Sequence, residues 1–242
     1  MNFEQTYLTF LIAVVLTACS NVNEQMTNNS FNTTAENLST KSSIEQQVQK
    51  TIQLDNDFEI KVGQKEDFGK FETYTLFILT HKSKQLYLDT SLTEYEFSDN
   101  LYPIVRQLDN ETFEVLVEVN DRPNINYLKY FKVYQDKIVS IEKLPTFISK
   151  ASNLDTDDYF EFAGFWDSGE TWGDNGSLIA YNPIIYYELK PNGITLDSTL
   201  TISKNREIYG DFHGFEYNEK IEFTTIETKK LNNEIKRINA TK

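Results

Sequence analysis

The amino-acid sequence predicts an all-β fold after a disordered tether: an antiparallel sandwich, a barrel or a partial propeller-like meander. Aromatic residues make up 14% of the chain, with 17 Phe and 14 Tyr, and this composition is typical of pleated, half-buried strands. Apolar and polar residues alternate in several stretches, and short apolar runs recur about every 8–12 residues between turn residues. The sequence has no fixed-period repeat, so a complete propeller is not expected.

The individual strands are predicted from the pattern of apolar residues. Residues 113–119 alternate with a period of two, which predicts a strand with one dry face. Residues 194–202 alternate in the same way. Residues 71–80 are apolar on both faces, which indicates a central strand. Further strands are expected at residues 58–62, 85–88, 102–108, 127–134, 137–143, 184–189 and 221–228.

Turn residues separate several of these strands. In Pro191-Asn192-Gly193, the Asn-Gly pair supplies the positive φ that hairpin turns require. Gln135-Asp136 and residues 109–111 hold similar positions between two predicted strands. Short connections of this kind favour antiparallel pairing of neighbouring strands.

The first residues of the chain indicate export and anchoring. Residues 10–16 form an apolar run that is too short to span a membrane, and the run leads into Leu16-Thr17-Ala18-Cys19. This motif resembles the lipobox of bacterial lipoproteins. The resemblance implies a signal peptide at residues 1–18 and a Cys19 whose acyl chains, such as palmitate, anchor the protein to a membrane. It also implies that the protein lies in the bacterial cell envelope, at the outer membrane or the cell surface. The alternative to lipidation is that Cys19 is a free thiol.

The rest of the chain is divided into three parts. Residues 19–56 are predicted to be a flexible tether, because residues 20–43 are rich in Asn, Ser, Thr and Glu. Apolar spacing within residues 44–54 predicts either a short helix or the end of the tether. Residues 57–228 are predicted to form one continuous all-β globular domain; the alternative is two packed halves with a soft boundary near residue 145. Residues 229–242 are a basic tail, expected as a terminal helix or a frayed end.

Charge and cysteine content restrict the classes of function. The chain has 37 acidic and 23 basic residues and a formal net charge of −14, so nucleic acid is not expected as a partner, because phosphate binding needs a basic face. The negative charge indicates either solubility at a crowded surface or affinity for cations and basic partners. Cys19 is the only cysteine, which excludes an intramolecular disulfide.

The main candidate for chemistry is an acidic loop that leads into a hydrophobic run. Asn153, Asp155 and Asp157 occupy loop positions 1, 3 and 5, and Glu161 occupies position 9. Side chains at alternate positions converge on the centre of a short loop, and the backbone carbonyl of Tyr159 is the expected ligand at position 7. The loop therefore predicts a Ca²⁺ site. The alternative is a polar turn whose Asp side chains accept hydrogen bonds from backbone amides.

Residues 153–166 resemble the calcium loops of FG-GAP-type β-repeat proteins, in which an Asp-rich loop precedes a strand. The resemblance is confined to this segment and implies calcium as the ligand. The segment departs from the pattern because Asn153 replaces an Asp and Asp158 stands where Gly is usual. Asp158 is therefore expected to adopt left-handed backbone geometry, which Asp tolerates better than most residues.

A segment rich in Trp and Gly follows this loop. It contains Trp166, Asp167, Trp172 and Asp174, and these four residues are a candidate ligand surface, because Trp rings beside acids suit the faces of sugar rings. The alternative is a long surface connection held in place by its Trp side chains. Asp167 and Asp174 are also candidates for cation ligands.

The sequence favours a binding module over an enzyme. The two histidines, His81 and His213, are isolated, and no Gly-x-Ser-x-Gly or His-Glu-x-x-His motif is present, so no catalytic residue is assigned. The expected function is a calcium-stabilised interaction module that binds another envelope protein or a glycan. One alternative is a glycan hydrolase that uses Glu161, Asp167 and Glu170. Another is an inhibitor of an external enzyme such as lysozyme, suggested by charge and location.

Overall fold

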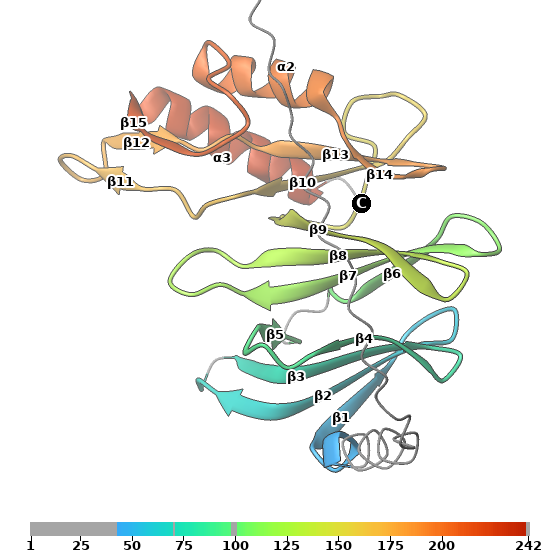
Figure 1. Ribbon diagram of the computed structural model, residues 1–242. Helices are drawn as coiled ribbons and strands as arrows, with labels where there is room; N and C mark the ends of the chain where they lie inside the picture. Colours follow the sequence, from blue (N-terminus) through green and yellow to red (C-terminus); the bar gives the residue numbers. More distant parts are fainter. Residues whose placement is uncertain (1–42, 70, 98–100, 241–242) are drawn as a thin grey trace, which may run out of the picture. The chain divides into compact units, whose positions relative to one another are not determined.

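A long antiparallel sheet organises the computed structural model, which describes residues 43–69, 71–97 and 101–240 (Figure 1). The sheet has 12 strands, and its main path runs β1-β2-β3-β5-β7-β8-β9-β10-β13-β14, with β4 paired to β3 and β6 to β7. The two ends of this path do not pair with each other, so the sheet is not closed into a barrel. The predicted antiparallel β fold is confirmed. The predicted signal peptide, Cys19 and residues 20–42 lie outside the described residues.

The first part of the sheet is built from five strands, namely β1 (Val48–Gln53), β2 (Phe58–Asp67), β3 (Glu72–His81), β4 (Lys84–Asp89) and β5 (Glu94–Glu96). β3 is buried along almost its whole length, as the sequence predicts for a central strand. The short helix predicted within residues 44–54 is a strand over most of that range. Alternate residues of β1 are half-buried and Ile52 packs on the core, so a period of two describes these residues better than a helical one.

The second part of the sheet contains β6 (Ile104–Gln107), β7 (Thr112–Asn120), β8 (Tyr127–Tyr134) and β9 (Lys137–Phe147). Gln135 and Asp136 form the turn between β8 and β9, with φ values of 47° and 55°, as a two-residue hairpin turn requires. β9 continues through Pro145 and pairs with β10 at its end. The residues from Ser43 onwards form one compact unit.

The third part of the structure combines strands with helices. β10 (Glu161–Phe165), β13 (Ile185–Lys190) and β14 (Gly193–Leu196) complete the large sheet. A three-stranded sheet consists of β11 (Thr171–Trp172), β12 (Leu178–Tyr181) and β15 (Asn218–Phe223). The helices α2 (Ser198–Tyr209) and α3 (Thr225–Ala240) pack on this part. Within residues 43–240, so far as they are described, no helix is long and apolar enough to cross a membrane.

The buried hydrophobic side chains of the described residues form three cores. The first lies between β2–β3 and β7–β8, the second between the other face of β7–β8 and β10–β13, and the third between β10–β13 and the helices. Representative side chains are Phe77 and Phe131 in the first, Leu128 and Phe162 in the second, and Tyr186 and Ile238 in the third. The pairs β7–β8 and β10–β13 are therefore buried on both faces.

Helix α2 replaces the second half of a predicted strand. The alternation across residues 194–202 ends at Leu196, because Asp197 caps the helix by accepting a hydrogen bond from the Leu200 amide at 2.8 Å. Gly210 ends α2 with a φ of 85°, the left-handed conformation that glycine adopts without strain. These two capping residues are the sequence signals that the alternation concealed.

Helix α3 replaces the end of another predicted strand. The strand expected at residues 221–228 ends at Phe223, because Thr224 and Glu227 form a capping box. The Thr224 amide donates to Glu227 Oε2 at 3.0 Å, and the Ile226 amide donates to Thr224 Oγ1 at 3.3 Å. Residues 229–240 of the predicted basic tail continue this helix, which agrees with the terminal-helix alternative.

The second face of β7 differs from the sequence prediction, because it is buried as well. Glu114 has a side-chain exposure of 0%. Its Oε2 accepts a hydrogen bond from Arg106 Nη1 at 2.7 Å, and its Oε1 accepts bonds from the Tyr130 hydroxyl at 2.7 Å and from the Ile194 amide at 2.8 Å. Arg106 also donates to the carbonyl of Lys190. One buried carboxylate thus joins β6, β7 and β8 to the β13–β14 hairpin.

We expect Arg106→Met to lower the free energy of unfolding by about 3–5 kcal/mol, because it leaves the buried Glu114 carboxylate without its counter-charge. Urea denaturation measures this loss. Lys143→Met is the control, since it breaks an exposed pair with Asp121 (Nζ to Oδ2, 3.3 Å) and should cost less than about 1 kcal/mol. Equal losses in the two variants would contradict a special role for the Glu114 network.

Candidate metal centre

A loop between β9 and β10 carries the acidic residues that the sequence singled out. The loop is closed at its base by an isolated bridge in which the Ser152 amide donates to the Glu161 carbonyl at 3.0 Å and the Glu161 amide donates to the Ser152 carbonyl at 2.8 Å. Glu161 is also the first residue of β10. The loop therefore begins and ends on the same pair of hydrogen-bonded residues.

Side-chain oxygens hold the loop in its conformation. Asn153 Oδ1 accepts a hydrogen bond from the Thr156 amide at 2.7 Å, and Asp155 Oδ1 accepts one from the Asp157 amide at 3.1 Å. Asp157 Oδ1 accepts a bond from the Tyr159 amide at 2.7 Å. Thr156 has a φ of 82°, which is strained for a β-branched residue. Such strain persists where the surroundings impose it, here through hydrogen bonds on both sides of Thr156.

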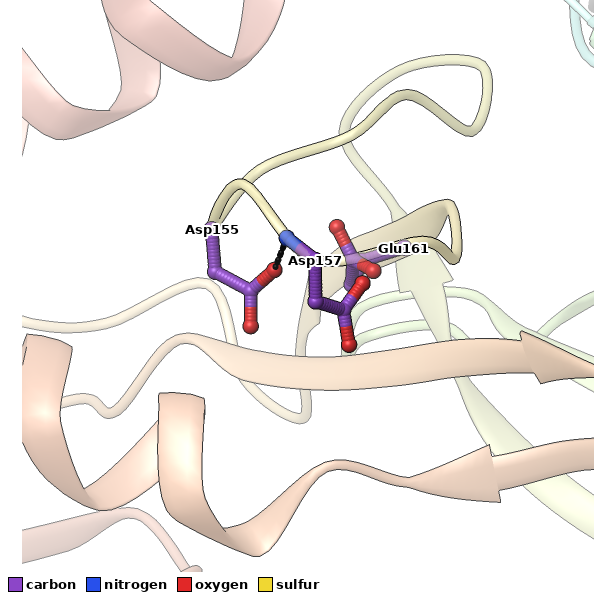
Figure 2. A group of neighbouring side chains, drawn as sticks. All are labelled: Asp155, Asp157 and Glu161. Atoms are coloured by element: carbon purple, nitrogen blue, oxygen red, sulfur yellow. Dashed lines mark hydrogen bonds between the residues drawn. The ribbon is translucent and has the colours of Figure 1, made fainter.

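Three carboxylates meet at the mouth of this loop. Asp155, Asp157 and Glu161 each offer an oxygen, and these oxygens all lie within 4.8 Å of one another. Figure 2 shows the two Asp side chains coming from the loop and Glu161 from the start of the strand beside them. Asp155 is half-buried, Asp157 is exposed and Glu161 is buried, so the cluster lies where the loop meets the protein interior.

Glu161 is the least accessible member of the cluster. It is only 1% exposed, and its Oε2 accepts a hydrogen bond from the Leu154 amide at 2.6 Å. Its Oε1 is buried and has no hydrogen-bond partner among the described residues. A buried polar atom without a partner is rare in folded proteins and costs free energy unless water or an ion satisfies it.

The surroundings of Glu161 oppose its ionisation. Burial and, to a lesser degree, the negative charges of Asp155, Asp157 and Asp197 raise the pKa of Glu161 to about 7, although the hydrogen bond from the Leu154 amide lowers it. A carboxylate placed among other carboxylates in a dry position binds a proton or a cation more readily than one in water. The electrostatics of this cluster therefore favour a bound positive charge.

The sheet adds polar residues that sequence reasoning missed. Ser152 faces Glu161, Glu161 faces Glu188, and Glu188 faces Thr195 across neighbouring segments. Directly opposed residues in antiparallel strands share one face, so the four side chains form a row beneath the loop. Ser152 Oγ and Thr195 Oγ1 are buried without a hydrogen-bond partner within the described part of the chain. The pairing register brings these residues together, and no local sequence signal shows it.

Two predicted loop residues have roles other than those expected. The side chain of Asn153 closes the loop, because it bonds the Thr156 amide and also donates to the Asp157 carbonyl. The left-handed residue is Thr156, and Asp158 has an ordinary negative φ, so the expectation for Asp158 was wrong. The loop differs from the FG-GAP-type pattern at this point because the Asn153 bond tightens it two residues earlier.

The structure separates the members of the predicted Trp-rich ligand surface. Trp166 packs against the second core, and Trp172 is half-buried in β11. Asp174 is exposed. Asp167 lines a cavity together with Glu170. Glu161 is not among the residues that line that cavity, so the three acids proposed for hydrolysis do not converge on it.

Both histidine rings pack against aromatic side chains. His81 is 2% exposed, stacks on Phe58 at 4.3 Å between ring centroids, and its Nδ1 lies 2.5 Å from Asp136 Oδ1. Its Nε2 is buried in the first core without a partner among the described atoms. His213 is exposed and packs edge-on against Tyr181. Neither ring belongs to the carboxylate cluster.

Comparisons of the chain with protein-family models, with curated proteins and with solved structures find no match.

In the presence of a chelator, we expect Glu161→Gln to stabilise the protein at pH 7–8. The pKa of Glu161 rises from 4.5 to about 7 on folding, so the folded protein holds the proton more tightly and stability falls as pH rises through this range. Because water screens the exposed Asp157, we expect the variant to gain about 1–2 kcal/mol. Denaturant unfolding from pH 4 to 8 measures both proteins. If the free energy of unfolding changed with pH in the same way in both proteins, the charge on Glu161 would not be unfavourable and the prediction would be wrong.

Proposed function

We propose that the protein is a lipid-anchored envelope protein whose β-domain binds one Ca²⁺ ion and acts as a binding module. The observation that carries this proposal is the buried, unpartnered Oε1 of Glu161 beside two further carboxylates. Oxygens bound to one Ca²⁺ at about 2.3–2.6 Å are separated by at most about 5 Å. The cluster's oxygens lie within 4.8 Å of one another, so the set suits a single ion.

The chemistry of the donors favours a hard cation. Asp155, Asp157 and Glu161 supply oxygen ligands, which suit Ca²⁺ or Mg²⁺ better than zinc or copper. Ca²⁺ accepts an irregular shell of carboxylates, backbone carbonyls and water, and the Tyr159 carbonyl remains the predicted backbone ligand. The bound ion offsets the repulsion that raises the pKa of Glu161 and ties the loop to β10.

A bound ion at this position supports recognition better than catalysis. Glu161 is 1% exposed, so a polymeric substrate has little access to its carboxylate. The same loop exposes two aromatic side chains, Tyr159 at 37% and Phe160 at 57%. Exposed aromatic residues are enriched at protein interfaces. We infer that the ion holds these rings in place for a partner at the cell envelope.

The proposed anchor rests on the sequence motif Leu16-Thr17-Ala18-Cys19. Acylation of Cys19 places the domain in the envelope, at the outer membrane or the cell surface. More than one acyl chain is needed for durable attachment, and lipidation at a lipobox cysteine supplies them. The tether between Cys19 and the domain then allows the loop to reach a neighbouring partner.

Millimolar CaCl₂ is expected to raise the melting temperature of the full chain by several degrees, because an ion that binds only the folded state stabilises it. For a domain of this size, each kcal/mol of binding corresponds to about 2–4 °C. Asp157→Asn and Glu161→Gln should remove the shift. Asp158→Asn, in the same loop but outside the cluster, should keep it, and MgCl₂ tests the selectivity. An unchanged melting temperature for the unmodified chain would rule out the site.

Cys19→Ala is expected to release the protein from membranes, because the variant lacks the acceptor for acylation. Fractionation of the cells into soluble and membrane material measures the change. Ser30→Ala, a substitution farther along the tether, should stay in the membrane fraction. Retention of the Cys19→Ala variant in membranes would refute the lipid anchor.

A further inference from the structure

The cavity lined by Asp167 and Glu170 lies between the segment that follows β10 and helix α3. Its volume is about 380 Å³, within the range of small-ligand sites. Its lining comes from Phe165 and residues 167–171, from β12 with Asn182, from α3, and from Ile125 in the connection between β7 and β8. None of the carboxylates of the proposed calcium site lines this cavity, so the inference stands independently of that site.

One wall of the cavity is apolar. Ile179 comes from β12, and Leu231 and Ile235 come from α3. Ile179 and Leu231 also belong to the third core or pack against it, so this wall continues the hydrophobic interior to the cavity. A hydrocarbon group gains free energy by leaving water for such a surface.

The lining also includes acidic residues. Asp167, which is half-buried, and Glu170, which is exposed, are both among the residues that line the cavity. Asp167 Oδ1 accepts a hydrogen bond from the Gly169 amide at 3.0 Å, which stabilises a turn between these two lining residues. Gly169 has a φ of +71°, and a Cβ there would lie 3.0 Å from Asn182 Nδ2, so glycine permits this close approach.

Asn182, another lining residue, is held in place by hydrogen bonds. It is 7% exposed. Its side-chain Nδ2 donates a hydrogen bond to the Asp167 backbone carbonyl at 2.9 Å, and its backbone carbonyl accepts one from the Tyr209 hydroxyl at 2.8 Å. Its Oδ1 has no hydrogen-bond partner in the part of the chain that the structure describes. A buried acceptor without a donor indicates a site that a ligand or water completes.

The charge and residue types of the lining indicate which class of ligand fits the cavity. Its described residues include no Lys, Arg or His, so an anion finds no counter-charge, whereas a cation finds Asp167 and Glu170. Neither Trp166 nor Trp172 lines the cavity, and Phe165 is the one aromatic residue among the described lining residues. The net charge of −14 also raises the local concentration of cations.

We propose that this cavity binds a small organic cation, with its ammonium group at Asp167 and Glu170 and its hydrocarbon body against Ile179, Leu231 and Ile235. The ammonium group donates hydrogen bonds to the carboxylates, and Asn182 Oδ1 accepts another. Charge-assisted bonds of this kind are stronger than neutral ones. The ligand is therefore an alkyl or arylalkyl amine, protonated at neutral pH.

Calorimetric titration of the full chain with 2-phenylethylammonium tests this proposal, with calcium present throughout. We expect saturable binding with a dissociation constant of about 0.1–1 mM for a ligand of this size. The matched neutral compound 2-phenylethanol should bind about tenfold more weakly, because it lacks the charge. Glucose and sodium hexanoate should not bind measurably. Equal binding of the charged and neutral compounds, or preferential binding of glucose, would overturn the proposal.

Two variants locate the binding. Glu170→Gln should weaken 2-phenylethylammonium about fivefold, whereas Glu216→Gln, an exposed carboxylate outside the lining, should leave it unchanged. Asn232→Trp, on the exposed side of α3, should fill the cavity and abolish binding while the melting temperature stays near that of the unmodified chain. Binding that is unaffected in both Glu170→Gln and Asn232→Trp would place the ligand elsewhere and refute the assignment, as would the absence of binding to the unmodified chain.

Discussion

The buried carboxylate of Glu114 is the interaction on which the arrangement of this fold depends. β7 is buried on both faces, one in the first core and the other in the second, so any charge on it needs a partner in the interior. Arg106 provides the counter-charge, and Tyr130 and the Ile194 amide complete the hydrogen bonds. Because Ile194 belongs to β14, satisfying this carboxylate also determines where the β13–β14 hairpin lies.

The position of that hairpin in turn shapes the candidate metal centre. Lys132 Nζ donates to the Asn192 carbonyl at 3.0 Å and supports the hairpin tip. From this hairpin come Glu188 and Thr195, which extend the polar row of Glu161, and Asp197 follows directly and raises the pKa of Glu161. The acidic loop supplies only part of the site. The neighbouring strands determine how buried the site is and how much negative charge surrounds it.

Helix α3 connects the two candidate sites. Arg237 Nη1 donates to the Leu154 carbonyl at 3.0 Å, while the Leu154 amide donates to Glu161. Tyr186 bonds Glu234 on the same helix at 2.8 Å. Leu231 and Ile235 of α3 line the cavity that is proposed to bind an amine. One helix thus braces the base of the acidic loop and forms a wall of the proposed amine site, which gives the two sites a shared support.

The sequence by itself determined the antiparallel β class, most of the strands and the acidic loop, because these depend on local alternation, turn residues and spacing. It also held the signals for both helices, in Asp197, Gly210 and the Thr224–Glu227 pair, although the alternation of apolar residues concealed them. Only the tertiary structure decided that both faces of β7 are buried, that Glu161 is enclosed and that Glu188 and Thr195 face it. Those features depend on pairing and packing between residues far apart in the chain, and local sequence patterns carry no information about them.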